Sequence, residues 1–189
     1  MGKLINGTWS LEDTPSALVN KKGEFVRAAS GFRDWVAPDG TTGYPAEAGR
    51  YHLFLSHSCP WAHRTQIGVM VKGLQDVVGM CFAILPRNDQ GWEYGEGTEG
   101  MVTGNRPFPL HRLYSDTDPG FTGRVTTPTL WDNKTGKVVN NESSDILRML
   151  NSAFRAYKKE GAPDLYPESL REEIDAINER VYPDFNNGV

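Results

Sequence analysis

A cysteine lies between an apolar segment and a stretch that begins with proline, in the run LSHSCPWAHR at residues 55–64. A thiol reacts as the thiolate, and a free cysteine is mostly protonated at neutral pH. Pro60 suits the first position of a helix, because that position needs no backbone N–H. Cys59 would then lie at a helix N-terminus, where unpaired N–H groups and the helix dipole favour an anion. We therefore expect Cys59 to be a nucleophile, with these nearby side chains as cationic neighbours: His57, His63 and Arg64.

The residues around this cysteine limit its chemistry. Ala62 stands where a Cys-x-x-Cys pair would have its second thiol, so any redox cycle needs a thiol from another molecule. A zinc site made of His57, Cys59 and His63 would lack a fourth ligand. The remaining alternative is a small core residue, as buried cysteines commonly are. The polar flank and the following proline favour a reactive Cys59, whereas Cys81 lies in an apolar segment and is expected to be structural.

The elements expected around Cys59 follow the order strand, helix, strand. We predict a strand at 51–55, a helix at 60–72 and a strand buried on both faces at 77–84. Such a unit takes a right-handed crossover. The remaining predicted elements are strands at 127–132 and 137–139 and helices that begin at 143 and 167. This order is that of a thioredoxin-like α/β domain.

Two segments depart from this regular order. Residues 1–48 keep no helical or strand period and are predicted to be an N-terminal extension, either wrapped on the core or loose. Residues 86–123 are polar and rich in glycine, and a connection of this length is usually functional or disordered. The thioredoxin-like domain is then predicted at 49–156, with a linker and the start of a helical domain at 157–189.

The bulk composition argues against several classes of protein. A chain of 189 residues holds one domain, or one domain and a fragment of another. Its net charge of −4 gives no sign of nucleic-acid binding, and it contains no apolar run of the length of a membrane span. The first residues lack the apolar core of a signal peptide, and two cysteines make no disulfide framework. We expect a cytoplasmic protein that binds neither nucleic acid nor membranes.

Three spaced motifs resemble those of the Xi-class glutathione transferases, the glutathionyl-hydroquinone reductases. The motifs are CPWA at 59–62, RVTTPTLWD at 124–132 and VNNESS at 139–144, and the match continues with DLYP at 164–167 and NNGV at 186–189. The resemblance covers nearly the whole chain. One departure is Thr127, where the family more often has valine. The resemblance implies the thioredoxin-like N-terminal domain of a glutathione transferase, with only the first part of the all-helical C-terminal domain.

The resemblance also implies a role for each motif. Cys59 would attack the sulfur of a glutathionyl adduct and form a mixed disulfide, which a second glutathione would release as oxidised glutathione. Trp92 would pack on the bound tripeptide, and Glu142 and Ser143 would hold its γ-glutamyl end. Four further residues would line the glutathione site: Arg124, Val125, Thr126 and Thr127. The implied partners are glutathione as co-substrate and glutathionylated aromatic small molecules, with no metal, and a homodimer is a further expectation.

Elementary chemistry supports these roles independently. The Thr-Pro bond at 127–128 enters a strand and is a natural place for a cis peptide, which turns the preceding N–H and C=O toward a peptide ligand. A helix N-terminus at Ser143 suits a carboxylate, and Glu142 suits an α-amino group. Each feature also has a simpler alternative. Pro128 would be an ordinary trans turn proline, and Glu142 and Ser143 would only cap a helix. Trp92 would pin its loop to the core, and Arg124 would be a solvated charge. Taken together with the cysteine, the ligand-binding interpretation is favoured.

Two alternatives to a hydroquinone reductase remain open. One is a general glutaredoxin-like deglutathionylase or dehydroascorbate reductase, and the other is a non-catalytic glutathione-binding fragment. The family places a tyrosine that protonates the departing aromatic ring directly after the position of Val189. We therefore expect the chain as given to be impaired in reducing glutathionyl-hydroquinones. The last predicted helix is expected to leave an apolar stripe without a partner, formed by Leu170, Ile174, Ile177 and Val181.

Overall fold

The centre of the computed structural model, which describes residues 2–11, 29–95 and 108–186, is a four-stranded sheet of order β4-β3-β7-β8. β3 is parallel to β4 and antiparallel to β7, and β7 is antiparallel to β8. The strands are β3 (Tyr51–Leu55), β4 (Gly79–Phe82), β7 (Thr129–Asp132) and β8 (Lys137–Asn140). This parallel pair followed by an antiparallel hairpin is the thioredoxin-like arrangement that the sequence predicts.

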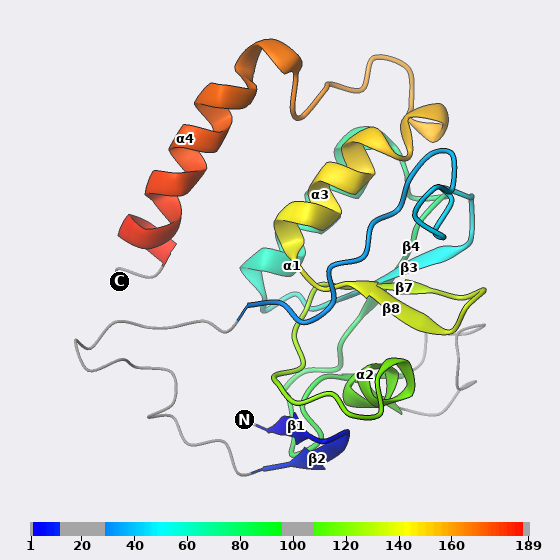
Figure 1. Cartoon of the computed structure of the whole chain (residues 1–189), viewed down its shortest axis with the longest axis vertical. Helices are drawn as coiled ribbons and strands as arrows, with labels where there is room; N and C mark the ends of the chain where they lie inside the picture. The colour runs from blue at the N-terminus through cyan, green and yellow to red at the C-terminus, as the bar shows by residue number, and fades with distance from the viewer. Residues whose placement is uncertain (1, 12–28, 96–107, 187–189) are drawn as a thin grey trace.

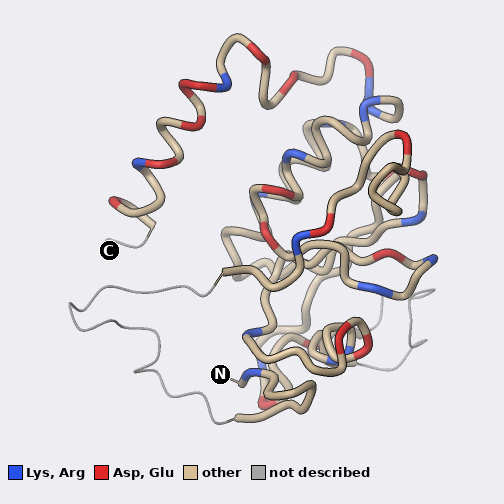
Figure 2. The backbone as a smooth tube through the Cα atoms, viewed as in Figure 1, with Lys and Arg blue, Asp and Glu red and all other residues tan. Residues whose placement is uncertain are grey.

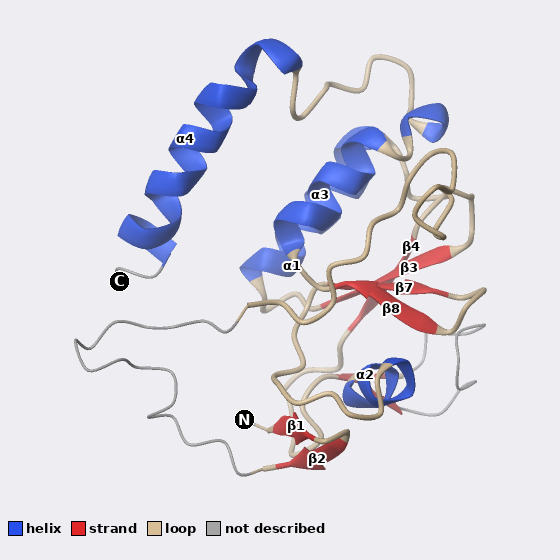
Figure 3. Ribbon diagram, in the orientation of Figure 1, coloured by secondary structure: helices blue, strands red, loops and turns tan. Residues whose placement is uncertain are grey.

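Helices cover both faces of this sheet (Figures 1 and 3). α1 (Pro60–Lys72) and α3 (Ser143–Ser152) lie side by side on one face, and the short α2 (His111–Thr117) lies on the other. α1 begins with proline at its first position, as expected, and ends at Gly73 with φ 70°, a left-handed conformation that glycine adopts without strain.

Each face of the sheet has its own apolar core. Successive side chains of a strand point to opposite faces, so Leu53 of β3 packs between the sheet and the pair α1 and α3, together with Val69 and Ile146. Phe54, the next residue, packs on the other side with Trp131 and the residues of α2. All five of these side chains are fully buried or nearly so. The sheet therefore holds the two helices that carry the site at fixed positions.

The N-terminus adds a hairpin of β1 (Lys3–Ile5) and β2 (Thr8–Ser10) beneath the second core. Leu4 is fully buried, its N–H donates to the carbonyl of Gly123 at 2.9 Å, and its carbonyl accepts from the N–H of Gly123 at 3.0 Å. Trp9 stacks on His111 with ring centroids 4.5 Å apart. The N-terminal extension is expected from the sequence to be either wrapped on the core or loose, and residues 2–11 are wrapped on the core.

The segment 86–123, expected from the sequence to be one long connection, contains regular elements where the structure describes it. It contains β5 (Glu93–Tyr94), β6 (Phe108–Pro109) and the helix α2. α2 has seven residues, too few for a helical period to be recognised, and only Leu113 and Tyr114 are buried. Residues 96–107 of the segment lie outside the described residues. The strand predicted at 77–84 is shorter than expected, since β4 covers four residues of it.

The helix α4 (Arg171–Val181) follows a 3₁₀ turn at Glu168–Leu170 and continues into a π-helical turn at Tyr182–Asn186. Acidic and basic residues are interspersed along α4 (Figure 2), which has no buried residue. Arg148 of α3 holds it through an ion pair with Asp175 at 2.9 Å. The expected apolar stripe is exposed at Leu170, Ile177 and Val181 and half-buried at Ile174.

The predicted domain boundaries near residues 48 and 156 stay predictions. Among the helices that the structure describes, none combines the length and the apolar character needed to cross a membrane.

Candidate active site

Cys59 directly precedes α1, as the sequence predicts. It is the N-cap residue, with extended backbone dihedrals (φ −110°, ψ 111°), and its carbonyl accepts the helical hydrogen bond from the N–H of His63 at 3.0 Å. Its side chain is half-buried, and the thiol donates to the carbonyl of Thr127 at 3.3 Å. The thiol therefore lies at the N-terminus of α1, where the first N–H groups of a helix have no partner within the helix.

Two of the three expected cationic neighbours have partners of their own, and the third, His63, is exposed. His57 lies flat on the Phe82 ring, with centroids 4.2 Å apart. The Arg64 guanidinium lies over the Trp61 ring and approaches the hydroxyl of Ser143 at 3.5 Å. Within residues 2–11, 29–95 and 108–186, no three His, Cys, Asp or Glu side chains gather in a way that could hold a metal ion.

The second cysteine has a very different environment. Cys81 lies in the middle of β4, is 4% exposed, and burial raises the pKa of its thiol to about 11. We expect iodoacetamide to alkylate Cys59 at least about tenfold faster than Cys81 at neutral pH, because only a thiolate that the reagent can reach reacts. Peptide mapping by mass spectrometry over a time course measures both rates. Equal rates, or faster modification of Cys81, would contradict this assignment.

The segment facing Cys59 is held by hydrogen bonds from two other elements. The Thr127–Pro128 peptide bond is cis, as predicted. The buried Tyr114 of α2 donates its hydroxyl to the carbonyl of Thr126 at 3.2 Å, and Asn141 donates its amide to the Thr126 hydroxyl at 3.1 Å. The backbone that lines the space beside the thiol is thereby fixed from α2 on one side and from the start of α3 on the other.

Two adjoining cavities, of about 280 and 440 Å³, meet at this segment. The smaller one reaches Glu142 and Ser143 at the start of α3, and the larger one reaches Cys59 and Trp92. They share four wall residues: Trp61, Arg124, Thr126 and Thr127. Val125 also lines the larger cavity. All the residues expected to form the site therefore lie along one cleft with the thiol on its wall.

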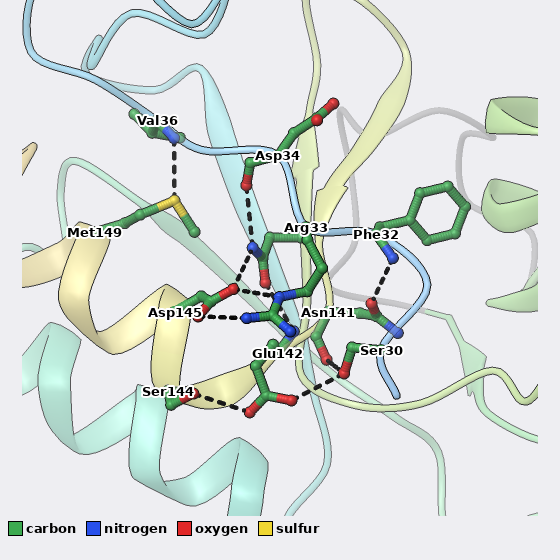
Figure 4. A network of polar contacts seen from close by, with 11 residues as sticks. Ser30, Phe32, Arg33, Asp34, Val36, Asn141, Glu142, Ser144, Asp145 and Met149 are labelled. Atoms are coloured by element: carbon green, nitrogen blue, oxygen red, sulfur yellow. Dashed lines mark hydrogen bonds and ion pairs between the residues drawn. The ribbon is translucent and has the colours of Figure 1, made fainter. Parts of the chain in front are cut away.

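Glu142 has a double role at the end of this cleft (Figure 4). One carboxylate oxygen accepts from the N–H of Ser144 at 3.3 Å, which makes Glu142 the N-cap of α3, and the other accepts from the Ser30 hydroxyl at 2.9 Å. The helix-cap alternative is thus realised, and the same carboxylate still lines the cavity. Ser143, the first residue of α3, is 3% exposed.

Several residues of the cleft escaped the sequence interpretation. The larger cavity is also lined by Trp9 of the N-terminal hairpin and by Arg87, whose guanidinium carbon lies 4.3 Å above the centre of the Trp92 ring. Trp9 donates its indole N–H to the carbonyl of Asp89 at 2.9 Å and so holds the loop that carries Arg87. The sequence gives little sign that Trp9 and Arg87 line the cleft, because Trp9, and Trp92 on which Arg87 packs, lie in segments without a helical or strand period.

Comparison with known proteins gives a consistent pattern. Residues 58–153 match the family model described as glutathione S-transferase, N-terminal domain. The whole chain is 41% identical to glutathionyl-hydroquinone reductase YqjG of Escherichia coli strain K12, covering 59% of that protein. It is also 41% identical to glutathionyl-hydroquinone reductase PcpF of Sphingobium chlorophenolicum, covering 58% of it. The chain therefore spans less than two thirds of the length of these curated relatives.

Solved structures agree with the sequence comparison. A Xi class GST from Natrialba magadii superposes with a TM-score of 0.83 at 36% identity, over 100% of this chain and 56% of that one. The glutathione-bound structure of YqjG from Escherichia coli K-12 superposes with a TM-score of 0.78, also at 36% identity, over 99% of this chain and 56% of that one.

Proposed function

This chain belongs to the Xi class of the glutathione S-transferase family, and we propose that it binds glutathione in the cleft beside Cys59 and uses that thiol to reduce glutathionylated aromatic compounds. The observation that carries the proposal is the position of Cys59, at the N-terminus of α1 and on the wall of a cleft that ends at Glu142 and Ser143. The relatives named as glutathionyl-hydroquinone reductases support the choice of substrate.

The smaller cavity suits the γ-glutamyl end of the tripeptide. An α-amino group there would meet the Glu142 carboxylate, which lines the cavity. The α-carboxylate would meet the first N–H groups of α3, a ten-residue helix, and the Ser143 hydroxyl. With this end fixed, the cysteinyl residue of glutathione would lie beside Thr127, whose carbonyl already contacts the Cys59 thiol.

The larger cavity then takes the glycyl end of the tripeptide. Arg87 lines it, and within the described residues the Arg87 guanidinium packs on Trp92 and makes no ion pair. A guanidinium held flat on a ring keeps its N–H edge for a carboxylate. Glutathione would therefore span the cleft from Glu142 to Arg87, with its sulfur near Cys59.

We expect Arg87→Gln to weaken glutathione binding about tenfold, since a charge-assisted hydrogen bond to the glycyl carboxylate is lost. The glycyl ethyl ester of glutathione lacks that charge, so its affinity should be nearly the same for the variant and the wild type. Isothermal titration with both ligands measures this difference, and Arg155→Gln, at an exposed arginine outside the cavity walls, is the control. An equal loss of affinity for both ligands would contradict the orientation.

The proposed reaction has two steps, and in each a thiolate attacks a sulfur atom. The Cys59 thiolate attacks the sulfur of the glutathionyl adduct, the carbon–sulfur bond breaks, and its electron pair leaves with the aromatic carbon, which takes a proton. A disulfide now joins Cys59 to glutathione. A second glutathione thiolate attacks the glutathione sulfur of this disulfide, releasing oxidised glutathione and the Cys59 thiolate. The aromatic compound is reduced, and the thioether sulfur of the adduct and the thiol sulfur of the second glutathione become the disulfide of oxidised glutathione.

Detection of the mixed disulfide tests this proposal. Incubation with a glutathionyl-hydroquinone should yield a glutathione adduct at Cys59, visible by intact-protein mass spectrometry, and added glutathione should remove it. Adduct formation with glutathionylated peptides at an equal rate would favour the general deglutathionylase, and binding without any adduct would favour the non-catalytic alternative. We place the reaction in the cytoplasm, where glutathione keeps thiols reduced. Cys59 and Cys81 do not form a disulfide with each other.

A further inference from the structure

The hydroxyl of Thr127 is buried without a hydrogen-bond partner. Thr127 is 5% exposed, and its Oγ1 makes no hydrogen bond within the part of the chain that the structure describes. A buried hydroxyl without a partner loses its bonds to water and gains nothing in return. A valine has nearly the same shape and would leave no such group. The hydroxyl therefore has a cost in the free protein that calls for an explanation.

The threonine hydroxyls next to Thr127, unlike its own, all have hydrogen-bond partners. The buried Thr129 donates its hydroxyl to the carbonyl of Thr126 at 2.8 Å, and it contacts the hydroxyl of Tyr114 at 3.0 Å. The N–H of Thr126 donates to the same Tyr114 hydroxyl at 3.3 Å. The polar groups on both sides of Thr127 thus have partners, and its own carbonyl accepts from the Cys59 thiol. The hydroxyls of Thr126 and Thr129 thus have partners, whereas that of Thr127 has none among the described residues.

Thr127 also occupies the point where the two cavities meet. It lines both of them, beside the thiol that faces the cleft. The hydroxyl oxygen is turned away from solvent, but a rotation about the Cα–Cβ bond to another staggered rotamer exchanges it with other substituents of Cβ. A ligand in the cleft can therefore be met by the hydroxyl without any backbone movement.

We propose that the Thr127 hydroxyl is a hydrogen-bonding partner of bound glutathione, contacting the peptide group next to the sulfur of the tripeptide. This inference rests on the proposed function, because it needs glutathione in the cleft. No bond is made or broken by the hydroxyl, so Thr127 is a positioning residue that orients the tripeptide sulfur toward Cys59. The hydrogen bond formed on binding compensates for the partner that the hydroxyl lacks in the free protein.

Thr127→Val separates binding from folding. We expect glutathione affinity to fall about tenfold, measured by isothermal titration, while the Tm of the free variant stays equal to that of the wild type or rises by about 2–4 °C. Thr127→Ser keeps the hydroxyl and should bind within about threefold of the wild type. The control is Thr65→Val in α1, because the buried Thr65 hydroxyl donates to the carbonyl of Ala62 at 2.8 Å. This control should lower the Tm and leave glutathione affinity unchanged.

The outcomes distinguish this inference from the proposed function. Wild-type protein that fails to bind glutathione would overturn the proposed function, and the inference with it. Wild-type binding with equal affinity in Thr127→Val would overturn the inference alone. A lower Tm for Thr127→Val would also overturn it, since the hydroxyl would then have a partner in the free protein. Weaker binding together with an unchanged or raised Tm, and recovery in Thr127→Ser, would support it.

Discussion

Cys59→Ser should abolish steady-state reduction of glutathionyl-hydroquinones, with a loss of about 10⁴-fold or more, as for the loss of other essential nucleophiles. A serine hydroxyl cannot form the disulfide with glutathione that the first step produces and the second step consumes. The side chain is nearly isosteric and lies at an N-cap, where serine is well tolerated, so the fold should be retained. The measurement is oxidised glutathione formed per enzyme and time, with intact mass as a second readout of the adduct.

Two controls make this result specific to Cys59. Glutathione should bind to Cys59→Ser within a few-fold of wild-type affinity, because the groups proposed to bind its two ends are unchanged. Cys81→Ala, which removes the buried thiol of β4, should keep its turnover. Retained turnover in Cys59→Ser would refute the monothiol mechanism, and lost turnover in Cys81→Ala would show that a second thiol takes part.

The second large effect concerns stability. Asp132, at the end of β7, is fully buried and accepts two hydrogen bonds from Arg50, at 2.8 Å and 2.7 Å. Asp132→Asn should lower the free energy of unfolding by about 3 kcal/mol, because it leaves the buried guanidinium with only the partly exposed Glu47, 3.0 Å away, as a charge partner. For a chain of this size, the Tm should fall by about 6–12 °C. Thermal and urea denaturation followed by circular dichroism measure the change.

The pH dependence of this ion pair has a definite sign. Burial alone would raise the pKa of the Asp132 carboxyl, but hydrogen bonds from Arg50, Thr135 and the backbone of Lys134 outweigh it and hold that pKa below its ordinary value. A carboxyl with a lowered folded-state pKa stabilises the fold above its unfolded pKa of about 3.9. This contribution is lost as the pH falls through the folded pKa. In Asp132→Asn, the free energy of unfolding should therefore not show the loss that protonation of Asp132 causes in the wild type at low pH.

An exposed ion pair provides the matched control. Asp175 of α4 pairs with Arg148 at 2.9 Å, with half of the Asp175 side chain exposed. Asp175→Asn should cost less than about 1 kcal/mol, as is usual for exposed pairs. Equal effects of Asp132→Asn and Asp175→Asn would show that burial does not determine the contribution of the Arg50 pair.

The part of the site that the sequence predicts is encoded locally. A proline after Cys59 and a glycine at position 73 mark the two ends of α1, and both ends lie where predicted. The same holds for the β3 strand and for the cis bond at Thr127–Pro128. In each case, one or two neighbouring residues restrict the backbone strongly enough to determine the local structure. The roles of the individual site residues stay proposals.

The rest depends on contacts between distant segments. Trp9 reaches the cleft because Leu4 is buried beneath α2, and neither position belongs to a pattern that predicts this. Arg87 is an exposed arginine in a polar run, and only the packing of its guanidinium on Trp92 singles it out. The unpaired hydroxyl of Thr127 likewise becomes visible only when all its neighbours are known. Tertiary packing, which local preference does not encode, determines these positions.

The N-terminal hairpin has a consequence for how the molecule is made. Gly7 donates its N–H to the carbonyl of Phe121 at 2.9 Å, and Asn6 donates its own to the hydroxyl of Thr122 at 2.9 Å, across more than a hundred residues of chain. During synthesis the first strands have to wait for this docking segment to leave the ribosome. Closing so long a loop carries an entropic cost, so the Trp9 wall of the cleft should assemble late. A bulky protein fused before β1 would then disturb the docking of this hairpin, and with it the position of Trp9 in the cleft, before it disturbed the rest of the fold.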